Sequence, residues 1–195
     1  LLRLQAHQAA ADLPDLSAQD WADAAGLVAD WYVLAITGQA QGRAEIVSAL
    51  AQTLTLLADG PRVMILRDYH AENLLHLPDR NGTARAGLLD FQLAQMGQPG
   101  YDLVSLLQDA RRDVPAPIET AMIARFSKAR RLDLAAFQAS YAALGALRSL
   151  RIMGIFARLC LDGGKPKYLS LIPRVWGQLQ ANLSHPALAP LRAAC

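Results

Sequence analysis

The feature that most limits the fold of this chain is a short β-like stretch set between long helical patterns. Residues 63–66 form an apolar run with the length of a buried strand, and residues 73–77 and 86–90 give two more short candidate strands. Between the last two, residues 78–82 spell Pro-Asp-Arg-Asn-Gly, which is a strong turn signal. The stretch therefore predicts a hairpin inside an otherwise helical domain.

The flanking segments carry helical signals. Ser17 and Asp20 have the spacing of a capping box, with Asp in place of the usual Glu, and a further helix is predicted over residues 44–57, ended by Gly60-Pro61. Asp102 and Asp133 occupy expected N-cap positions. The helices predicted in this later part cover residues 103–110, 118–128, 134–143, 146–161 and 168–183.

The expected fold class is therefore mainly α, an α+β domain in which a small β hairpin region carries the catalytic loop. We expect one domain over residues 1–195, with an active-site segment at residues 62–114. Hydrophobic residues make up 53% of the 195 residues and charged residues 18%, which is enough apolar surface for a core and excludes a disordered tail.

The charge and cysteine content exclude several classes of partner. The net charge is +2 with no basic block, so we expect neither nucleic acid nor a membrane surface as a partner. Cys160 and Cys195 are far apart in the sequence and indicate neither a disulfide framework nor a metal cluster. No signal peptide and no apolar run of membrane-spanning length is present, so a cytoplasmic location is expected.

The residues whose side chains could take part in catalysis lie in the β-like stretch. The sequence LRDYHAENLL at residues 66–75 fits the kinase catalytic-loop pattern H-R-D-x-x-x-x-N, with Leu66 in the place of His. The sequence GLLDFQ at residues 87–92 fits the D-F-G pattern, with Gln92 in the place of Gly. The D-x-x-x-x-N spacing is weak by itself, but a preceding strand, a hairpin turn and a following apolar-apolar-Asp-Phe make a compound signal.

Phosphoryl transfer needs these residue types at this spacing. A carboxylate just after a strand, Asp68, can accept the proton of a substrate hydroxyl, while the amide oxygen of Asn73 and the carboxylate of Asp90 can ligate Mg²⁺ on the phosphates of ATP. A hairpin would bring Asn73 and Asp90 close together. The alternative is that Asp68 and Asn73 are turn formers and Asp90 caps a strand, which is the better interpretation of any one of them alone.

With these motifs, the sequence resembles the aminoglycoside phosphotransferase (kinase-like) family. Within it, the chain is similar to bacterial cell-wall amino-sugar kinases, which phosphorylate the anomeric hydroxyl of N-acetylmuramate and N-acetylglucosamine in peptidoglycan recycling. The resemblance rests on residues 66–75, 88–92 and 101–114, and more weakly on 151–159 and 173–176. It implies a C-terminal kinase lobe that transfers the γ-phosphate of ATP to a small-molecule hydroxyl acceptor, with Asp68 as catalytic base and Asn73 and Asp90 as Mg²⁺ ligands.

The resemblance also implies a nucleotide-gripping N-terminal lobe before residue 1. No glycine-rich phosphate loop precedes Asp68, no lysine precedes Lys128, and the chain begins at Leu1 rather than Met. We therefore expect a lobe of a longer enzyme, with the N-terminal lobe as its partner and negligible ATP turnover by the chain alone.

Further residues near the motifs are candidates for contacting substrate or positioning the loop. For His70 and Tyr69 we favour bracing and packing of the loop over contact with a sugar. Asp102 is either a helix N-cap or an anchor for the backbone of the catalytic loop. Arg111 and Arg112 are either partners for an anionic sugar or a solvated helix C-terminus. The full candidate set is Arg67, Tyr69, His70, Glu72, Asp102, Arg111 and Arg112.

Two other functions remain open from the sequence. Leu66, and Leu93 where this branch of the family leads us to expect Asp, favour a non-catalytic pseudokinase-like binding module, whereas joint retention of Asp68, Asn73 and Asp90 favours an enzyme. Within enzymes, an aminoglycoside, choline-like or homoserine-like acceptor is the alternative to a sugar.

Overall fold

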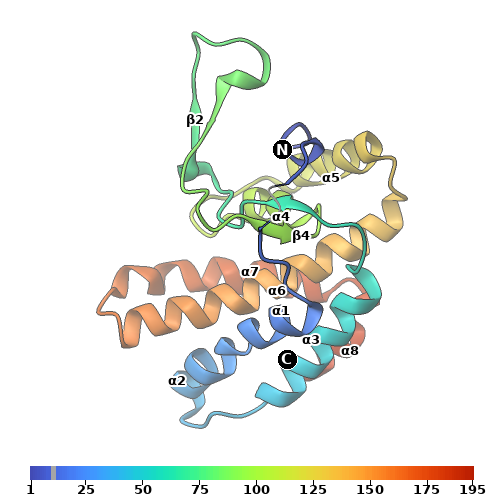
Figure 1. Ribbon diagram of the computed structural model, residues 1–195. Helices are drawn as coiled ribbons and strands as arrows, with labels where there is room; N and C mark the ends of the chain where they lie inside the picture. The colour runs from blue at the N-terminus through green and yellow to red at the C-terminus, as the bar shows by residue number, and fades with distance from the viewer. Residues whose placement is uncertain (10–11) are drawn as a thin grey trace. The chain divides into compact units, whose positions relative to one another are not determined.

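The computed structural model describes residues 1–9 and 12–195 (Figure 1). The chain divides into two compact units, residues 1–15 with 60–134 and residues 16–59 with 135–195, which we call the loop unit and the helical unit. The expected active-site segment, residues 62–114, lies entirely within the loop unit. The expectation of a single domain over residues 1–195 remains a prediction.

The helical unit consists of helices joined by short loops. Helix α1 packs on α3, and α3 packs on the C-terminal helix α8. Large side chains such as Trp21, Leu50 and Leu147 are fully buried in its core. The α-helices are α1 (Ala18–Ala25), α2 (Leu34–Thr37), α3 (Arg43–Leu57), α6 (Leu134–Leu161), α7 (Ile172–Leu183) and α8 (Ala189–Ala194), with a π-helix at Val28–Val33 and 3₁₀-helices at Pro166–Leu171 and Pro186–Leu188.

The start of α1 confirms the capping box. The Ser17 hydroxyl accepts the backbone N–H of Asp20 at 3.1 Å, and the Asp20 carboxylate accepts the backbone N–H of Ser17 at 2.9 Å. The Ser17 hydroxyl also donates to the Asp20 carboxylate at 2.6 Å, and this bond, followed by the one from the Ser17 backbone N–H, favours the charged form and lowers the pKa of Asp20. The helix predicted over 44–57 is also confirmed, because α3 spans Arg43–Leu57.

The two helices predicted over 134–143 and 146–161 are in fact one continuous helix, α6. Gly145 does not break it, because a Cβ at this position would overlap the side chain of Asn182 in α7, so the glycine permits a close approach of two helices. Gly154 has a similar role, since its Cβ would overlap the backbone of Leu27. Glycine in this helix therefore marks close packing and not a turn.

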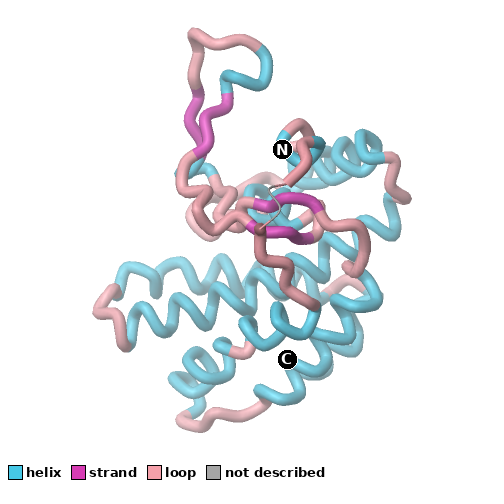
Figure 2. Tube along the Cα trace, in the orientation of Figure 1, coloured by secondary structure: helices cyan, strands magenta, loops and turns pink. Residues whose placement is uncertain are grey.

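The described residues of the loop unit form two small antiparallel sheets (Figure 2). The predicted hairpin is confirmed: β2 (Leu74–His76) pairs with β3 (Ala86–Leu88), with Leu74 opposite Leu88. The strand predicted at 63–66 is also confirmed as β1 (Val63–Ile65), but it pairs with β4 (Gln95–Gly97), which the sequence did not predict. The rest of the unit comprises α4 (Tyr101–Leu107), α5 (Ala116–Arg130) and 3₁₀-helices at Leu4–Ala6, Ala71–Asn73 and Gly82–Arg85.

The mainly-α expectation with a small β region is thus confirmed, while some helix boundaries differ. Helix α4 begins at Tyr101 with Gly100 as its N-cap, so the N-cap prediction for Asp102 is wrong. The segment predicted as one helix over 168–183 starts with the 3₁₀-helix Pro166–Leu171 and becomes α-helical only at Ile172. None of the described helices is both long and apolar enough to cross a membrane.

The close packing at Gly154 can be tested by replacing Gly154 and, as a control, Gly177 with alanine. Gly154→Ala adds a methyl group against the Leu27 backbone and is expected to lower the free energy of unfolding by about 1–3 kcal/mol. Gly177→Ala in α7 meets nothing within 4 Å, so its better helix propensity should raise stability by about 0.5–1 kcal/mol. Urea denaturation measures both, and a loss of stability at both glycines would contradict this account.

Candidate active site

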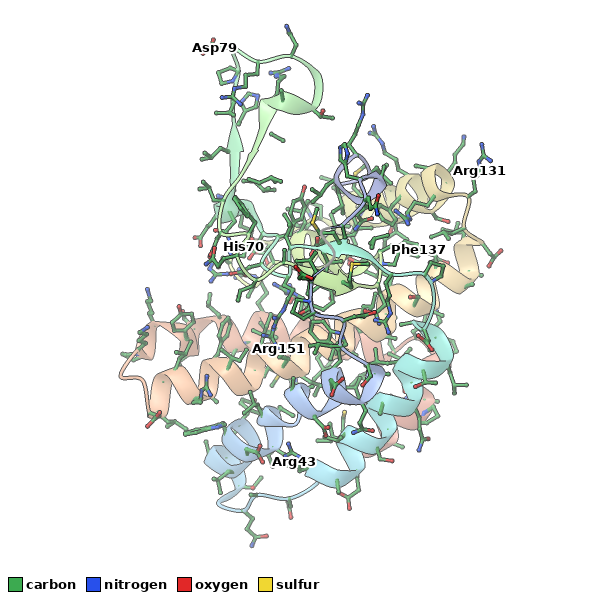
Figure 3. The ribbon with its side chains drawn as sticks, viewed as in Figure 1. Arg43, His70, Asp79, Arg131, Phe137 and Arg151 are labelled. Carbon is green, nitrogen blue, oxygen red and sulfur yellow. The ribbon has the colours of Figure 1, made fainter. Side chains whose placement is uncertain are left out.

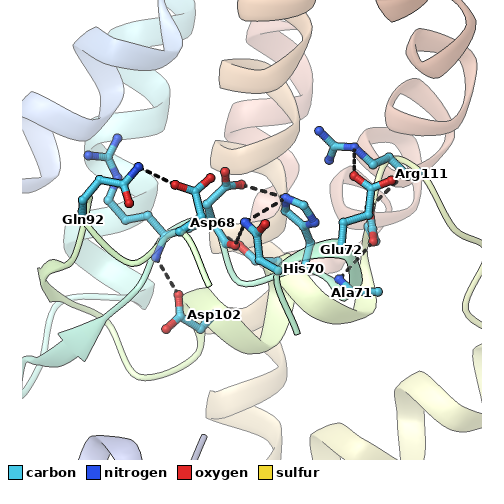
Figure 4. A network of polar contacts seen from close by, with 12 residues as sticks. Asp68, His70, Ala71, Glu72, Gln92, Asp102 and Arg111 are labelled. Carbon is cyan, nitrogen blue, oxygen red and sulfur yellow. Dashed lines mark hydrogen bonds and ion pairs between the residues drawn. The ribbon is translucent and has the colours of Figure 1, made fainter. Parts of the chain in front are cut away.

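A buried carboxylate of α4 fixes the backbone just before Asp68. Asp102 is fully buried, and its two carboxylate oxygens accept the backbone N–H groups of Leu66 at 2.8 Å and Arg67 at 3.0 Å (Figure 4). The Ser105 hydroxyl, one turn later in α4, donates to the carbonyl oxygen of Arg67 at 3.2 Å. Asp102 is therefore the anchor of the loop backbone, which was one of the two roles considered for it.

The anchored backbone adopts an unusual conformation at Arg67. Its φ angle is +68°, in the left-handed region that residues with a Cβ rarely occupy. Such a conformation persists only where the surroundings hold it, and here both the N–H and the carbonyl of Arg67 are bonded to α4. The turn places Asp68 immediately after a rigid point of the fold.

Leu66 occupies the position where the kinase pattern has His. Its side chain is 5% exposed and lies in the apolar core, while its backbone N–H bonds Asp102. The departure from the pattern therefore changes the packing beneath the loop and leaves the anchoring bond intact.

Asp68, His70 and Asn73 form a compact polar group in the loop (Figure 4). The Asn73 Nδ2 group donates to the carbonyl oxygen of Asp68 at 2.9 Å. The Nε2 atom of His70 lies 3.3 Å from Asp68 Oδ1 and 3.3 Å from Asn73 Nδ2. The loop thus folds back so that Asn73 lies beside Asp68, five residues earlier.

The hairpin connects Asn73 with the strand that ends just before Asp90. The backbone N–H of Leu89 donates to the carbonyl oxygen of Asn73 at 2.9 Å, which extends the β2–β3 ladder by one pair and leaves Asp90 as the next residue. Gln92, in the place of the D-F-G glycine, donates from its side-chain amide to Asp90 Oδ1. Figure 4 shows Gln92 on one side of Asp68 and His70 on the other. The bonds therefore join Asn73 to Asp68 through its side chain and place Asp90 one residue beyond the pair formed by Asn73 and Leu89.

A second buried carboxylate, which the sequence interpretation missed, fixes the other end of the loop. Asp109 is 1% exposed, and its oxygens accept the N–H groups of Ala71 at 3.4 Å and Arg111 at 2.9 Å. Arg111 in turn pairs through Nε with the Glu72 carboxylate at 3.0 Å. An acidic residue just after an apolar helix, within a segment that resembles the family, was the available signal.

The remaining candidates lie around this group in different environments. Tyr69 is buried, and burial, followed by the negative charge of Asp102, raises the pKa of its hydroxyl. Arg67 is half-buried and Arg112 is exposed. Leu93 is 50% exposed and does not enter the core.

The donor set suits a hard cation. The described residues contain no cluster of three or more His, Cys, Asp or Glu side chains that could hold a metal by themselves. One amide oxygen and one carboxylate match the preference of Mg²⁺ for a few protein oxygens completed by water and phosphate. Because Asn73 Nδ2 is used to bond Asp68, the Oδ1 atom is the part of this amide suited to a cation.

Comparison with known proteins identifies the family. The model of the phosphotransferase enzyme family matches residues 1–147, so the chain belongs to this family. More narrowly, it is 54% identical over 128 residues to the N-acetylmuramate/N-acetylglucosamine kinase of Caulobacter vibrioides, covering 65% of this chain and 35% of that protein.

Proteins of the same name in two other bacteria are also similar. The identity is 35% over 154 residues for Pseudomonas putida, covering 75% of this chain and 42% of that protein. For Pseudomonas aeruginosa the identity is 32% over 178 residues, covering 85% of this chain and 51% of that protein. The chain thus spans about half the length of these relatives or less.

The anchoring role of Asp102 gives a direct prediction. Asp102→Asn replaces one of the two acceptor oxygens by an NH₂ group, so one backbone N–H of the loop loses a charge-assisted bond. The free energy of unfolding should therefore fall by about 1.5–3 kcal/mol. Amide hydrogen exchange at Leu66 and Arg67 should accelerate. Asp79→Asn, at the exposed far end of the hairpin (Figure 3), is the matched control and should change neither quantity. Unchanged exchange in Asp102→Asn would exclude the anchoring role.

Proposed function

We propose that the protein containing this chain transfers the γ-phosphate of ATP to a hydroxyl of a cell-wall amino sugar, N-acetylmuramate or N-acetylglucosamine, in peptidoglycan recycling in the cytoplasm. The observation that carries the proposal is the pair of bonds made by Asn73, which connects Asp68 through its side chain and the strand before Asp90 through its carbonyl. The acceptor class is supported by relatives named as kinases of these two sugars.

The roles of the three residues follow from their environments. The Asp68 side chain is 44% exposed, so its carboxylate is accessible to an incoming hydroxyl and takes its proton as the phosphoryl group is transferred. Asn73 and Asp90 supply the oxygens for Mg²⁺. When bound, Mg²⁺ neutralises phosphate charge in this kind of reaction. Glu72, in the same loop, is paired with Arg111.

The residues that bind the phosphates of ATP are proposed to lie in a part of the protein outside this chain. The relatives extend well beyond the matched region, and the sequence here has no lysine before Lys128 and no glycine-rich loop before Asp68. Asp68, Asn73 and Asp90 offer acidic and amide oxygens, which suit a hydroxyl and a metal ion but do not neutralise phosphate oxygens. The nucleotide-binding lobe is therefore the expected partner of this chain.

One prediction of this proposal concerns the base. In the full-length protein, Asp68→Asn should lower kcat by about 10²–10⁴-fold, since the amide cannot accept the hydroxyl proton. The affinity for Mg²⁺ and ATP should stay within a few-fold. A coupled assay with both sugars, an aminoglycoside, choline and homoserine measures turnover and identifies the acceptor, with Asp79→Asn as the control.

Near-normal turnover of Asp68→Asn would rule out its role as base. Binding of Mg²⁺ and ATP with no turnover on any acceptor would favour the pseudokinase-like module.

Another prediction of this proposal concerns the isolated chain. Residues 1–195 alone should phosphorylate the acceptor at least about 10³-fold more slowly than the full-length protein, because the nucleotide is not positioned against Asp68. The same assay measures both proteins at equal concentration. Comparable turnover would show that this chain holds a complete nucleotide site.

A further inference from the structure

His70 is a buried imidazole in direct contact with the proposed base. Only 4% of this residue is exposed, and its Nε2 atom lies 3.3 Å from the Asp68 carboxylate. Its other ring nitrogen, Nδ1, is buried and has no hydrogen-bond partner among the residues that the structure describes. Only one nitrogen of this buried ring therefore has a polar partner, and that partner is the carboxylate of the proposed base. Such an arrangement of a buried polar side chain requires an explanation.

The two polar groups next to His70 Nε2 require opposite hydrogen-bonding roles of this nitrogen. The ionised Asp68 carboxylate can only accept a hydrogen bond, whereas the Asn73 Nδ2 group can only donate one. Both lie at 3.3 Å, so distance does not separate them. Nε2 can serve one of them in any given protonation state, and the ring tautomer decides which.

Energetics favour the carboxylate. Asn73 Nδ2 already donates to the carbonyl of Asp68 at 2.9 Å, so it loses little if Nε2 does not accept from it. A bond from Nε2–H to a carboxylate is charge-assisted and roughly twice as strong as one between neutral groups. The opposite tautomer would direct a lone pair at the carboxylate and leave a buried Nδ1–H donor unpaired, which costs more than an unpaired acceptor nitrogen.

We propose that His70 is a positioning residue for Asp68, and that its Nε2–H holds Oδ1 of the carboxylate. This inference rests on the proposed phosphotransferase function. The Asp68 side chain is 44% exposed, so packing alone does not set the rotation of its carboxylate about the Cβ–Cγ bond. A bond from a ring that is itself immobilised by burial fixes this rotation and thereby the position of the oxygen that meets the acceptor hydroxyl.

Two isosteric substitutions in the full-length protein separate this role from simple bracing of the loop. The side-chain NH₂ of Gln reaches the position of Nε2, whereas that of Asn reaches only the position of Nδ1. We expect His70→Gln to keep kcat within about tenfold of the wild type, and His70→Asn to lose about 10²-fold, the cost of a misplacement near 1 Å. KM values for ATP and acceptor should change little in either variant.

Equal kcat values for the Gln and Asn variants, with both proteins folded by circular dichroism, would overturn the inference. If either variant fails to fold, the ¹⁵N spectrum of histidine-labelled wild-type protein decides: an Nε2–H tautomer at His70 supports the inference and an Nδ1–H tautomer overturns it. A wild-type protein without turnover on any acceptor refutes the proposed function instead, so the two failures are distinguishable.

Discussion

A carboxylate that is shut off from water, Asp102, accepts two adjacent backbone N–H groups, and the geometry of the site follows from that contact. A buried charge is costly unless it is fully bonded, so Asp102 and the turn at Leu66 and Arg67 stabilise each other. The left-handed conformation of Arg67 is held in this way, and it determines the direction in which Asp68 leaves strand β1.

Acidic residues of the loop unit fall into two groups by burial. Asp102 and Asp109 are 0% and 1% exposed, and they bond backbone N–H groups at the two ends of the catalytic loop. Asp68 and Asp90 are accessible to solvent, and they carry the carboxylates proposed for chemistry. Burial thus separates the carboxylates that shape the loop from those proposed to meet substrate and metal.

Local signals in the sequence were sufficient for the hairpin and the capping box at Ser17, because each depends on turn chemistry and short spacing. The grouping of Asp68, Asn73 and Asp90 in one site stays a prediction. Features that depend on distant partners were not predictable. From the sequence alone Gly145 predicts a break between two helices, because its contact with Asn182 in α7 is not visible there. Strand β4 forms by pairing with β1, which is about 30 residues earlier in the chain. Asp109 could not be assigned without Ala71, 38 residues earlier.

The central claim is that Asp68, Asn73 and Asp90 share one Mg²⁺-nucleotide site, and paramagnetic broadening tests it most directly. Mn²⁺ takes the same oxygen ligands as Mg²⁺, so Mn²⁺ added with ATP to the labelled full-length protein should broaden amide signals near its site. The account predicts simultaneous loss of signals from residues 68–74 and 88–91. Broadening of only one of these segments, or of neither, would contradict it.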